Sequence, residues 1–345
     1  MLAFALVATA CTSVPGSAIA RSAPESFSPL VKRVLPSVVN IAVTETVSGG
    51  EVLSELPPEL RDTPLGREFR RRFGNRKEQT MGAGSGFIID SSGLIVTNNH
   101  VVGHADKIVV SLTNGTRLPA EVIGSDELTD VALIKVQATS PLPAVAFGDS
   151  RQVEVGDWVL AAGNPFGLGG SVTAGIVSAR GRDLGAGPFD NFLQLDAPIN
   201  PGNSGGPIFN MDGQVVGVST AIVSPSGGSV GIGFATPSEL VMPIINQLRT
   251  SGHIERGWLG VSVANSDNGV TIAGIERTSP AARAGLRQGD IILSVNGERI
   301  EGALGLIRTV AAVSPGSTVN LTIRRQGREF DMPVTVGQRP SGGAG

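Results

Sequence analysis

The sequence predicts an all-β chain that folds as two domains, and three observations support this. The chain has 345 residues, more than the roughly 100 to 200 of a typical single domain. Gly accounts for 47 of them, about twice its ordinary usage. Short apolar runs separated by turn residues recur along the chain with few helical patterns between them, which is typical of β-barrels and sandwiches.

The first twenty residues predict a secretory signal. Residues 2–20 carry no charge, include the apolar stretch LAFALVATA and end in AIA, which predicts cleavage after Ala20. Two alternatives stay open, namely an uncleaved membrane anchor and lipid attachment at Cys11, the single cysteine. No Lys or Arg precedes the apolar run, and this counts against the cleaved signal, the membrane anchor and the lipid attachment alike.

The first domain is expected over residues 28–250. Strands are predicted at 37–47, at two runs within 84–102, in an Asn-Gly hairpin at 107–123, and at 130–136, 158–163, 175–179, 206–210 and 214–223. A long polar insertion at 48–80 has the composition of an exposed loop. Residues 237–252 predict a helix that ends at Gly252.

A second domain is expected over residues 258–338, after a linker at 251–257 and before a flexible tail at 339–345. It contains strand patterns near 259–264 and 269–275, a Gly-bounded segment at 279–297, a short helix near 303–313 and a hairpin at 318–336.

The stretch DAPINPGNSGGPIFN, residues 196–210, surrounds Ser204 with glycines and prolines just before an apolar run. A serine hydroxyl is a poor nucleophile unless a base removes its proton, and histidine is the usual base. His100 ends the strand-like LIVTNNH and Asp130 opens DVALIKV, so both side chains are expected at strand ends facing one cleft. Asp130 would hold the imidazole tautomer that faces Ser204. The order His, Asp, Ser is that of chymotrypsin.

The glycines beside Ser204 predict an oxyanion hole. Backbone N–H groups of Gly202 and Ser204 converge if the loop turns sharply, and glycine permits such a turn. GNSGG also matches the nucleophile elbow of α/β-hydrolases, but that class needs its histidine downstream of the serine. The only downstream histidine is His253, in the expected linker, so the esterase hypothesis is disfavoured.

No metal, cofactor or nucleic acid is expected. His104 lies four residues after His100, but no Glu lies between them as in H-E-x-x-H and no cysteine cluster assists, so His104 and His253 are interpreted as structural. The net charge of −3 gives no reason to expect nucleic acid or an anionic membrane as partner. The basic run at 67–77 is interpreted as a solvated loop, and no P-loop motif is present.

The motifs TNNHVV, DVALIKV, GNPFGLGGSVTAGIVSA and PGNSGGPIFN together resemble the HtrA (Deg, or protease Do) family of serine endopeptidases, and the C-terminal part resembles a PDZ domain. The resemblance covers roughly residues 28–338. It implies a chymotrypsin-like double barrel followed by one PDZ domain, a homotrimer, and ATP-independent degradation of misfolded or unfolded proteins in the periplasm. It gives His100 the role of base, Asp130 that of its orienter and Ser204 that of nucleophile.

Further residues follow from the resemblance. Pro198 stands where trypsin-like enzymes carry the Asp that selects Lys or Arg. The candidate substrate-binding residues Ile199, Ala221 and Ile222 are apolar. A small or medium aliphatic residue is therefore expected at the cleaved position of the substrate. The stretch RGWLGV resembles a PDZ carboxylate-binding loop, which makes peptide-binding candidates of Trp258, Leu259, Gly260 and Val261.

Departures from the family pattern leave alternatives open. Asn203 replaces the Asp that pairs with a new N-terminus in zymogens, so loop reordering is the expected mode of activation. The family often has Thr at the position of Leu195. A membrane-tethered regulatory sensor protease and a chaperone or peptide-binding scaffold remain alternatives, whereas the insertion at 48–80 favours quality control.

Overall fold

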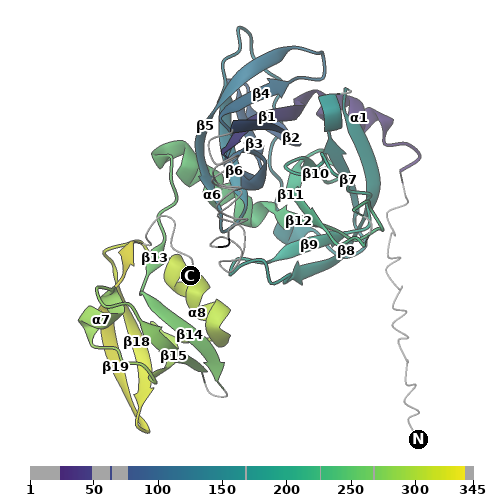
Figure 1. Ribbon diagram of the computed structural model, residues 1–345. Coiled ribbons are helices and arrows are strands. Elements are labelled where there is room, and N and C mark those ends of the chain that lie inside the picture. Colours follow the sequence, from purple (N-terminus) through teal and green to yellow (C-terminus); the bar gives the residue numbers. More distant parts are fainter. Residues whose placement is uncertain are drawn as a thin grey trace, which may run out of the picture.

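Two closed six-stranded β-barrels and a smaller sheet domain make up the protein, which is described here by a computed structural model (Figure 1). The structure describes residues 24–48, 63, 77–167, 169–225, 227–266 and 269–338. No helix in these ranges is long and apolar enough to span a membrane. The predicted signal, the basic run up to residue 76 and the predicted tail lie outside the described residues.

The first barrel has the strand order β1-β2-β3-β6-β5-β4, with every pair antiparallel. Its strands are β1 (Val38–Ser48), β2 (Lys77–Asp90), β3 (Leu94–Thr97), β4 (Lys107–Ser111), β5 (Arg117–Asp126) and β6 (Val131–Val136). The second barrel has the order β10-β11-β12-β9-β8-β7. Its strands are β7 (Trp158–Gly163), β8 (Ser171–Arg182), β9 (Phe192–Leu195), β10 (Pro207–Phe209), β11 (Val215–Ile222) and β12 (Gly233–Pro237).

Strand β6 shows why the sequence has a nearly continuous apolar run at this point. Successive side chains of a strand point to opposite faces. Ala132 and Ile134 fill the interior of the first barrel, while Val131 and Leu133 pack into a second core that also receives Leu160 and other residues of the second barrel. Both faces of β6 are therefore buried, and the two barrels share one apolar interface.

Three α-helices accompany the barrels in the described residues. They are α1 (Ser28–Val34), the single turn α5 (Asn99–Val102) and α6 (Ser238–Ser251). The same part of the chain also contains the 3₁₀ turns η1 (Leu35–Ser37), η2 (Ser150–Gln152) and η3 (Pro165–Gly167). The α6 helix buries Val241, Ile245 and Leu248 in the core between the barrels. It ends at Gly252, whose φ of 75° is left-handed and suits glycine.

The C-terminal domain is a sheet of order β14-β15-β16-β18-β19. These strands are β14 (Val261–Ser266), β15 (Gly269–Ile275), β16 (Ile291–Val295), β18 (Thr318–Arg325) and β19 (Arg328–Thr335), with β17 (Glu298–Arg299) paired to β16, and β13 (Gly257–Trp258) paired to β20 (Gly337–Gln338). Two helices complete the domain, α7 (Pro280–Ala284) and α8 (Gly302–Ala311).

An ion pair between Asp290 and Arg325 joins the start of β16 to the end of β18. Asp290 is 1% exposed and accepts hydrogen bonds from the Arg325 guanidinium at 2.7 and 2.6 Å. Burial acts to raise the pKa of Asp290, but the hydrogen bonds from Arg325 and from the Arg287 backbone N–H outweigh it, so the pKa lies below its ordinary value.

The C-terminal domain touches the barrels through two arginines. Arg256, just before β13, forms a buried bidentate pair with Asp126 at 2.5 and 2.6 Å, and its guanidinium lies 4.6 Å from the centre of the Phe189 ring. Arg308 of α8 donates hydrogen bonds to the backbone carbonyls of Pro188 and Asp190. Phe189, Pro188 and Asp190 all belong to the loop between β8 and β9, so both arginines contact this loop.

Five features differ from the sequence-based expectations. Strand β2 begins at Lys77, because Lys77–Gly82 pair with Val43–Ser48 in a long hairpin, so the end of the predicted insertion is a strand. Strands β9 and β12 and helix α1 were not predicted, since their short stretches lack clear alternation. His100 lies on the α5 turn, not at the end of a strand.

Candidate active site

His100 and Asp130 form a hydrogen-bonded pair of side chains. Asp130 Oδ2 lies 2.7 Å from His100 Nδ1, and Asp130 Oδ1 accepts the backbone N–H of His100 at 2.8 Å. One carboxylate therefore fixes both the ring and the backbone of the histidine. This arrangement leaves Nε2 of His100 available to act on a substrate or a neighbouring hydroxyl.

The backbone of Asp130 adopts an unusual conformation with φ of 54°, a left-handed angle that Asp tolerates better than most residues. The carbonyl oxygen of Asp130 accepts hydrogen bonds from the Asn98 amide at 2.8 Å and the Asn99 backbone N–H at 3.2 Å. The two asparagines that precede His100 thus hold the turn that carries Asp130.

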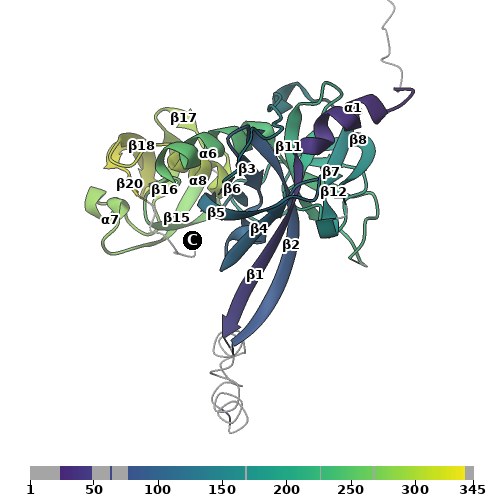
Figure 2. The ribbon, with the colours of Figure 1, turned by 90° about the horizontal axis from the view of Figure 1, so that it is seen from above.

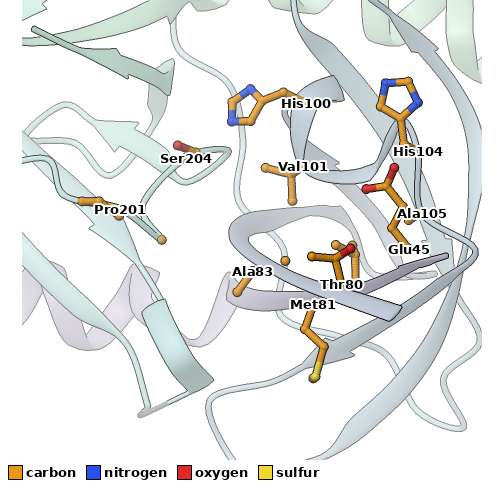
Figure 3. Close-up of a pocket in the computed structure, with 13 residues that line it drawn as sticks. Glu45, Thr80, Met81, Ala83, His100, Val101, His104, Ala105, Pro201 and Ser204 are labelled. Carbon is orange, nitrogen blue, oxygen red and sulfur yellow. The ribbon is translucent and has the colours of Figure 1, made fainter. Parts of the chain in front are cut away.

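Ser204 lies in the loop before β10 and shares a cleft of about 380 Å³ with His100 (Figure 3). The cleft lies where the β1–β2 hairpin, the α5 turn and the loop of Ser204 meet. Among the described residues no hydrogen bond joins Ser204 Oγ to His100. In enzymes without bound substrate, the contact between a nucleophile and its base is often long and shortens only in the complex.

The loop before Ser204 presents free backbone donors. Neither the N–H of Gly202 nor that of Ser204 donates a hydrogen bond to any described group. Gly202 has φ of 96°, and a Cβ there would lie 2.7 Å from Pro165, so both conformation and space require glycine. The N–H groups that the sequence predicts for an oxyanion hole are therefore unoccupied.

Ser85 of β2 ties this loop to the first barrel. Its hydroxyl donates to the Gly202 carbonyl at 2.6 Å and accepts the Asn164 N–H at 2.8 Å, and its own N–H donates to the Ser204 carbonyl at 2.8 Å. With the Gly202 carbonyl held by Ser85, the peptide groups around it have a fixed orientation.

A second cleft of about 400 Å³ lies on the other side of His100. It is lined by Asp130, by Thr220 and Ala221 of β11, and by residues of the β8–β9 loop such as Phe189. Of the other predicted substrate-binding residues, Ile199 is buried in the core of the second barrel, and Ile222 packs against that core.

The predicted peptide-binding loop lies between β13 and β14. Gly260 has φ of 73°, and a Cβ there would lie 2.2 Å from the Cβ of Ser279 and 2.8 Å from the Trp258 ring. The carbonyls of Leu259 and Gly260 accept hydrogen bonds from Ala281 and Glu276, whereas the N–H groups of Leu259 and Gly260 donate to no described group. Val261 begins β14.

Sequence reasoning missed Asn98, Ser85 and His104 as residues of the site. His104, interpreted as structural, lines the Ser204 cleft, and its spacing of four from His100 was the available signal. No group of three or more metal-ligating side chains occurs within the described ranges. Nothing in the sequence near Ser85 marks its contacts, because its partners lie 79 and 117 residues away.

Comparison with known proteins gives consistent matches. Residues 84–218 match the trypsin-like peptidase domain and residues 257–336 match the PDZ domain. The chain is 42% identical over 356 residues to a probable periplasmic serine endoprotease DegP-like of Brucella suis, covering 91% of this chain and 69% of that protein. A protein of the same name from Rhizobium meliloti is also 42% identical, over 92% of this chain and 70% of its own length.

Solved structures agree with the sequence matches. The HtrA-type protease AlgW with a decapeptide superposes with a TM-score of 0.78 at 37% identity, covering 91% of this chain and 99% of the other. The serine endoprotease from Yersinia pestis superposes with a TM-score of 0.72 at 34% identity, covering 92% and 100%. The chain thus combines a double barrel that matches the trypsin-like peptidase domain with one PDZ domain, and its relatives are named as periplasmic proteases. We conclude that the chain belongs to the HtrA family of periplasmic serine endoproteases.

Proposed function

We propose that Ser204, His100 and Asp130 are the catalytic residues of this endoprotease. The observation that carries the proposal is the Asp130 carboxylate, which lies 2.7 Å from His100 Nδ1 while His100 and Ser204 line one cleft. Asp130 keeps the proton on Nδ1, so Nε2 is the acceptor, and it stabilises the imidazolium that forms during attack.

The reaction follows from these roles. Ser204 Oγ bonds to the carbonyl carbon of the substrate as its proton passes to His100 Nε2, and the carbonyl oxygen becomes an oxyanion that the N–H groups of Gly202 and Ser204 bind. His100 then returns the proton to the leaving amine as the C–N bond breaks. Water hydrolyses the acyl-enzyme by the same steps, and no cofactor or ATP takes part.

A labelling experiment tests these roles. Ser204→Ala should abolish degradation of unfolded casein and covalent labelling by a fluorophosphonate, with a loss of roughly 10⁴ to 10⁶ in kcat. Ser171→Ala changes an exposed serine of β8 outside the cleft and should leave both unchanged. Labelling of Ser204→Ala at the wild-type rate would refute the assignment, and casein held soluble but uncut by the wild type would favour the scaffold alternative.

We propose that substrates are unfolded envelope proteins cut after small or medium aliphatic residues. Ala221 lines the second cleft, whereas Ile199 and Ile222 lie in or against the core of the second barrel. This supports the proposal, because none of the three offers a charge to a basic residue. A screen of peptide substrates should show Val, Ile or Ala preferred over Arg at the cleaved position. Strong preference for Arg would refute this proposal.

The C-terminal domain is proposed to bind peptide C-termini at Trp258, Leu259, Gly260 and Val261. The free N–H groups of Leu259 and Gly260 suit a carboxylate, and the peptide would add as a strand beside β14. Calorimetry should show that amidation of the peptide C-terminus abolishes binding. Gly260→Ala should do the same, because its Cβ would collide with Ser279.

Further proposals concern organisation. We propose domain limits of 28–250 and 258–338, a homotrimer, and export by the N-terminal segment at 1–20, cleaved after Ala20 or retained as an anchor. Sedimentation of the protein, and N-terminal sequencing of protein recovered from an envelope fraction, test these points. A retained segment would favour the membrane-tethered sensor protease over a free quality-control enzyme.

A further inference from the structure

The cleft that contains Ser204 extends away from the second cleft and forms a separate subsite. His100 lines both clefts, but no residue of β11 lines the cleft of Ser204. The proposed function, on which this inference rests, assigns Ala221 and Ile222 of β11 to the acyl half of the substrate. The leaving half must depart on the other side of Ser204, into the space beside Gly202 and the β1–β2 hairpin.

The hairpin offers a free edge to an extended chain at this place. Strand β2 pairs with β1 along Lys77–Phe87 but with β3 only from Phe87 to Asp90. The N–H of Ser85 on the opposite edge of β2 donates to the Ser204 carbonyl, and before Ser85 this edge has no strand partner within the described part of the chain. Gly82 and Ala83 of this segment line the cleft, and Figure 2 shows the hairpin extending beyond the barrels. An unpaired strand edge accepts a further strand through backbone hydrogen bonds.

One carboxylate dominates the chemistry of this subsite. Of the described residues that line the cleft, Glu45 is the only Asp, Glu, Lys or Arg. Its carboxylate has no ion pair with any residue in the described ranges. Figure 3 shows it on the hairpin, pointing toward the ring of His104. Within the described part of the chain the charge is thus unpaired, and it belongs to the wall of the cleft that would receive the leaving half of a substrate.

We propose that Glu45 is a specificity-determining residue that selects substrates with Lys or Arg among the first three residues after the cleaved bond. Selection by charge at this subsite is independent of the aliphatic preference proposed for the acyl half. Glu45 contacts no reacting atom, and it acts by binding the leaving half in the acylation step.

The test uses the full chain and quenched fluorogenic peptides that share one acyl half and carry Lys, Gln or Glu at the first, second or third leaving-side position. For at least one position the ratio of kcat/KM for Lys over Glu should exceed one in the wild type. A partly exposed ion pair predicts that Glu45→Gln lowers this ratio roughly two- to fivefold, and Glu45→Lys should invert the preference. The preference should shrink in 1 M NaCl, where the screening length is about 3 Å.

Two controls separate this inference from the proposed function. Glu121→Gln removes an exposed carboxylate of β5 outside the cleft and should leave every ratio unchanged. A p-nitroanilide with the same acyl half has no leaving-side residues, so wild type and Glu45→Gln should cleave it equally. Equal Lys to Glu ratios in wild type and Glu45→Gln, with the anilide still cleaved, overturn the inference alone. Cleavage that persists in Ser204→Ala overturns the assignment of the nucleophile and with it the location of the subsite.

Discussion

Replacing Arg256 with Met removes the cation that links the C-terminal domain to the first barrel. The side chains of Arg256 and Asp126 are only 9% and 5% exposed, and two hydrogen bonds join them. In Arg256→Met the carboxylate stays buried with the Thr129 hydroxyl as its remaining side-chain partner. Breaking a buried pair on one side costs about 3 to 5 kcal/mol.

Urea unfolding measures this cost. With a slope of about 2 to 3 kcal/mol per M, a loss of this size lowers the midpoint by about 1 to 2.5 M. Trp158 lies in the second barrel and Trp258 in β13, so fluorescence in a Trp258→Phe background reports the barrels alone. Since Asp126 begins the turn that ends at Asp130, kcat should fall as well.

A matched variant and a double-mutant cycle make the argument refutable. Arg151 pairs with Asp149 on the surface, with side chains 74% and 32% exposed, and Arg151→Met should cost less than about 1 kcal/mol. Adding Asp126→Leu to Arg256→Met should restore most of the lost stability, because the unpaired charge is then gone. A loss as small as that of Arg151→Met, or strict additivity in the cycle, would refute the reasoning.

Three further changes have defined outcomes. Asp130→Asn keeps a residue that tolerates φ of 54° but presents an amide to His100 Nδ1, so kcat should fall about 10⁴-fold while circular dichroism stays unchanged. Ser85→Ala leaves the Gly202 carbonyl without its hydrogen bond. The free energy of unfolding should fall by about 1 to 3 kcal/mol, and kcat on the p-nitroanilide substrate should fall as well. An unchanged kcat would show that this hydrogen bond does not position the loop of Ser204. The pKa of Asp290 is lowered in the folded state, so its stabilising effect is present above about pH 4 and lost as the pH falls below that value. The free energy of unfolding of Asp290→Asn should therefore change less between pH 6 and pH 3 than that of the wild type.

The strands of both barrels were predictable where side-chain alternation or a turn marks them. The hairpin around Asn114 and Gly115 and the continuous apolar run of β6 are examples. Strand β9 was not predictable, because its four residues are held by partners in β8 and β12 rather than by a pattern of their own. The start of β2 at Lys77 likewise follows from its pairing with β1.

The sequence alone determined the chemical candidates at the site. These are a serine in a glycine-rich turn, a histidine and an aspartate upstream of it in the order His, Asp, Ser, and a C-terminal peptide-binding loop. These signals are local, since each depends on residue types within a few positions. Only the tertiary structure decided which distant groups hold and surround them. Ser85 reaches Gly202 across 117 positions and Arg256 reaches Asp126 across 130, and Glu45 and Ser204 come to line the same cleft. Such contacts depend on the closure and packing of the two barrels, which no short stretch of sequence encodes.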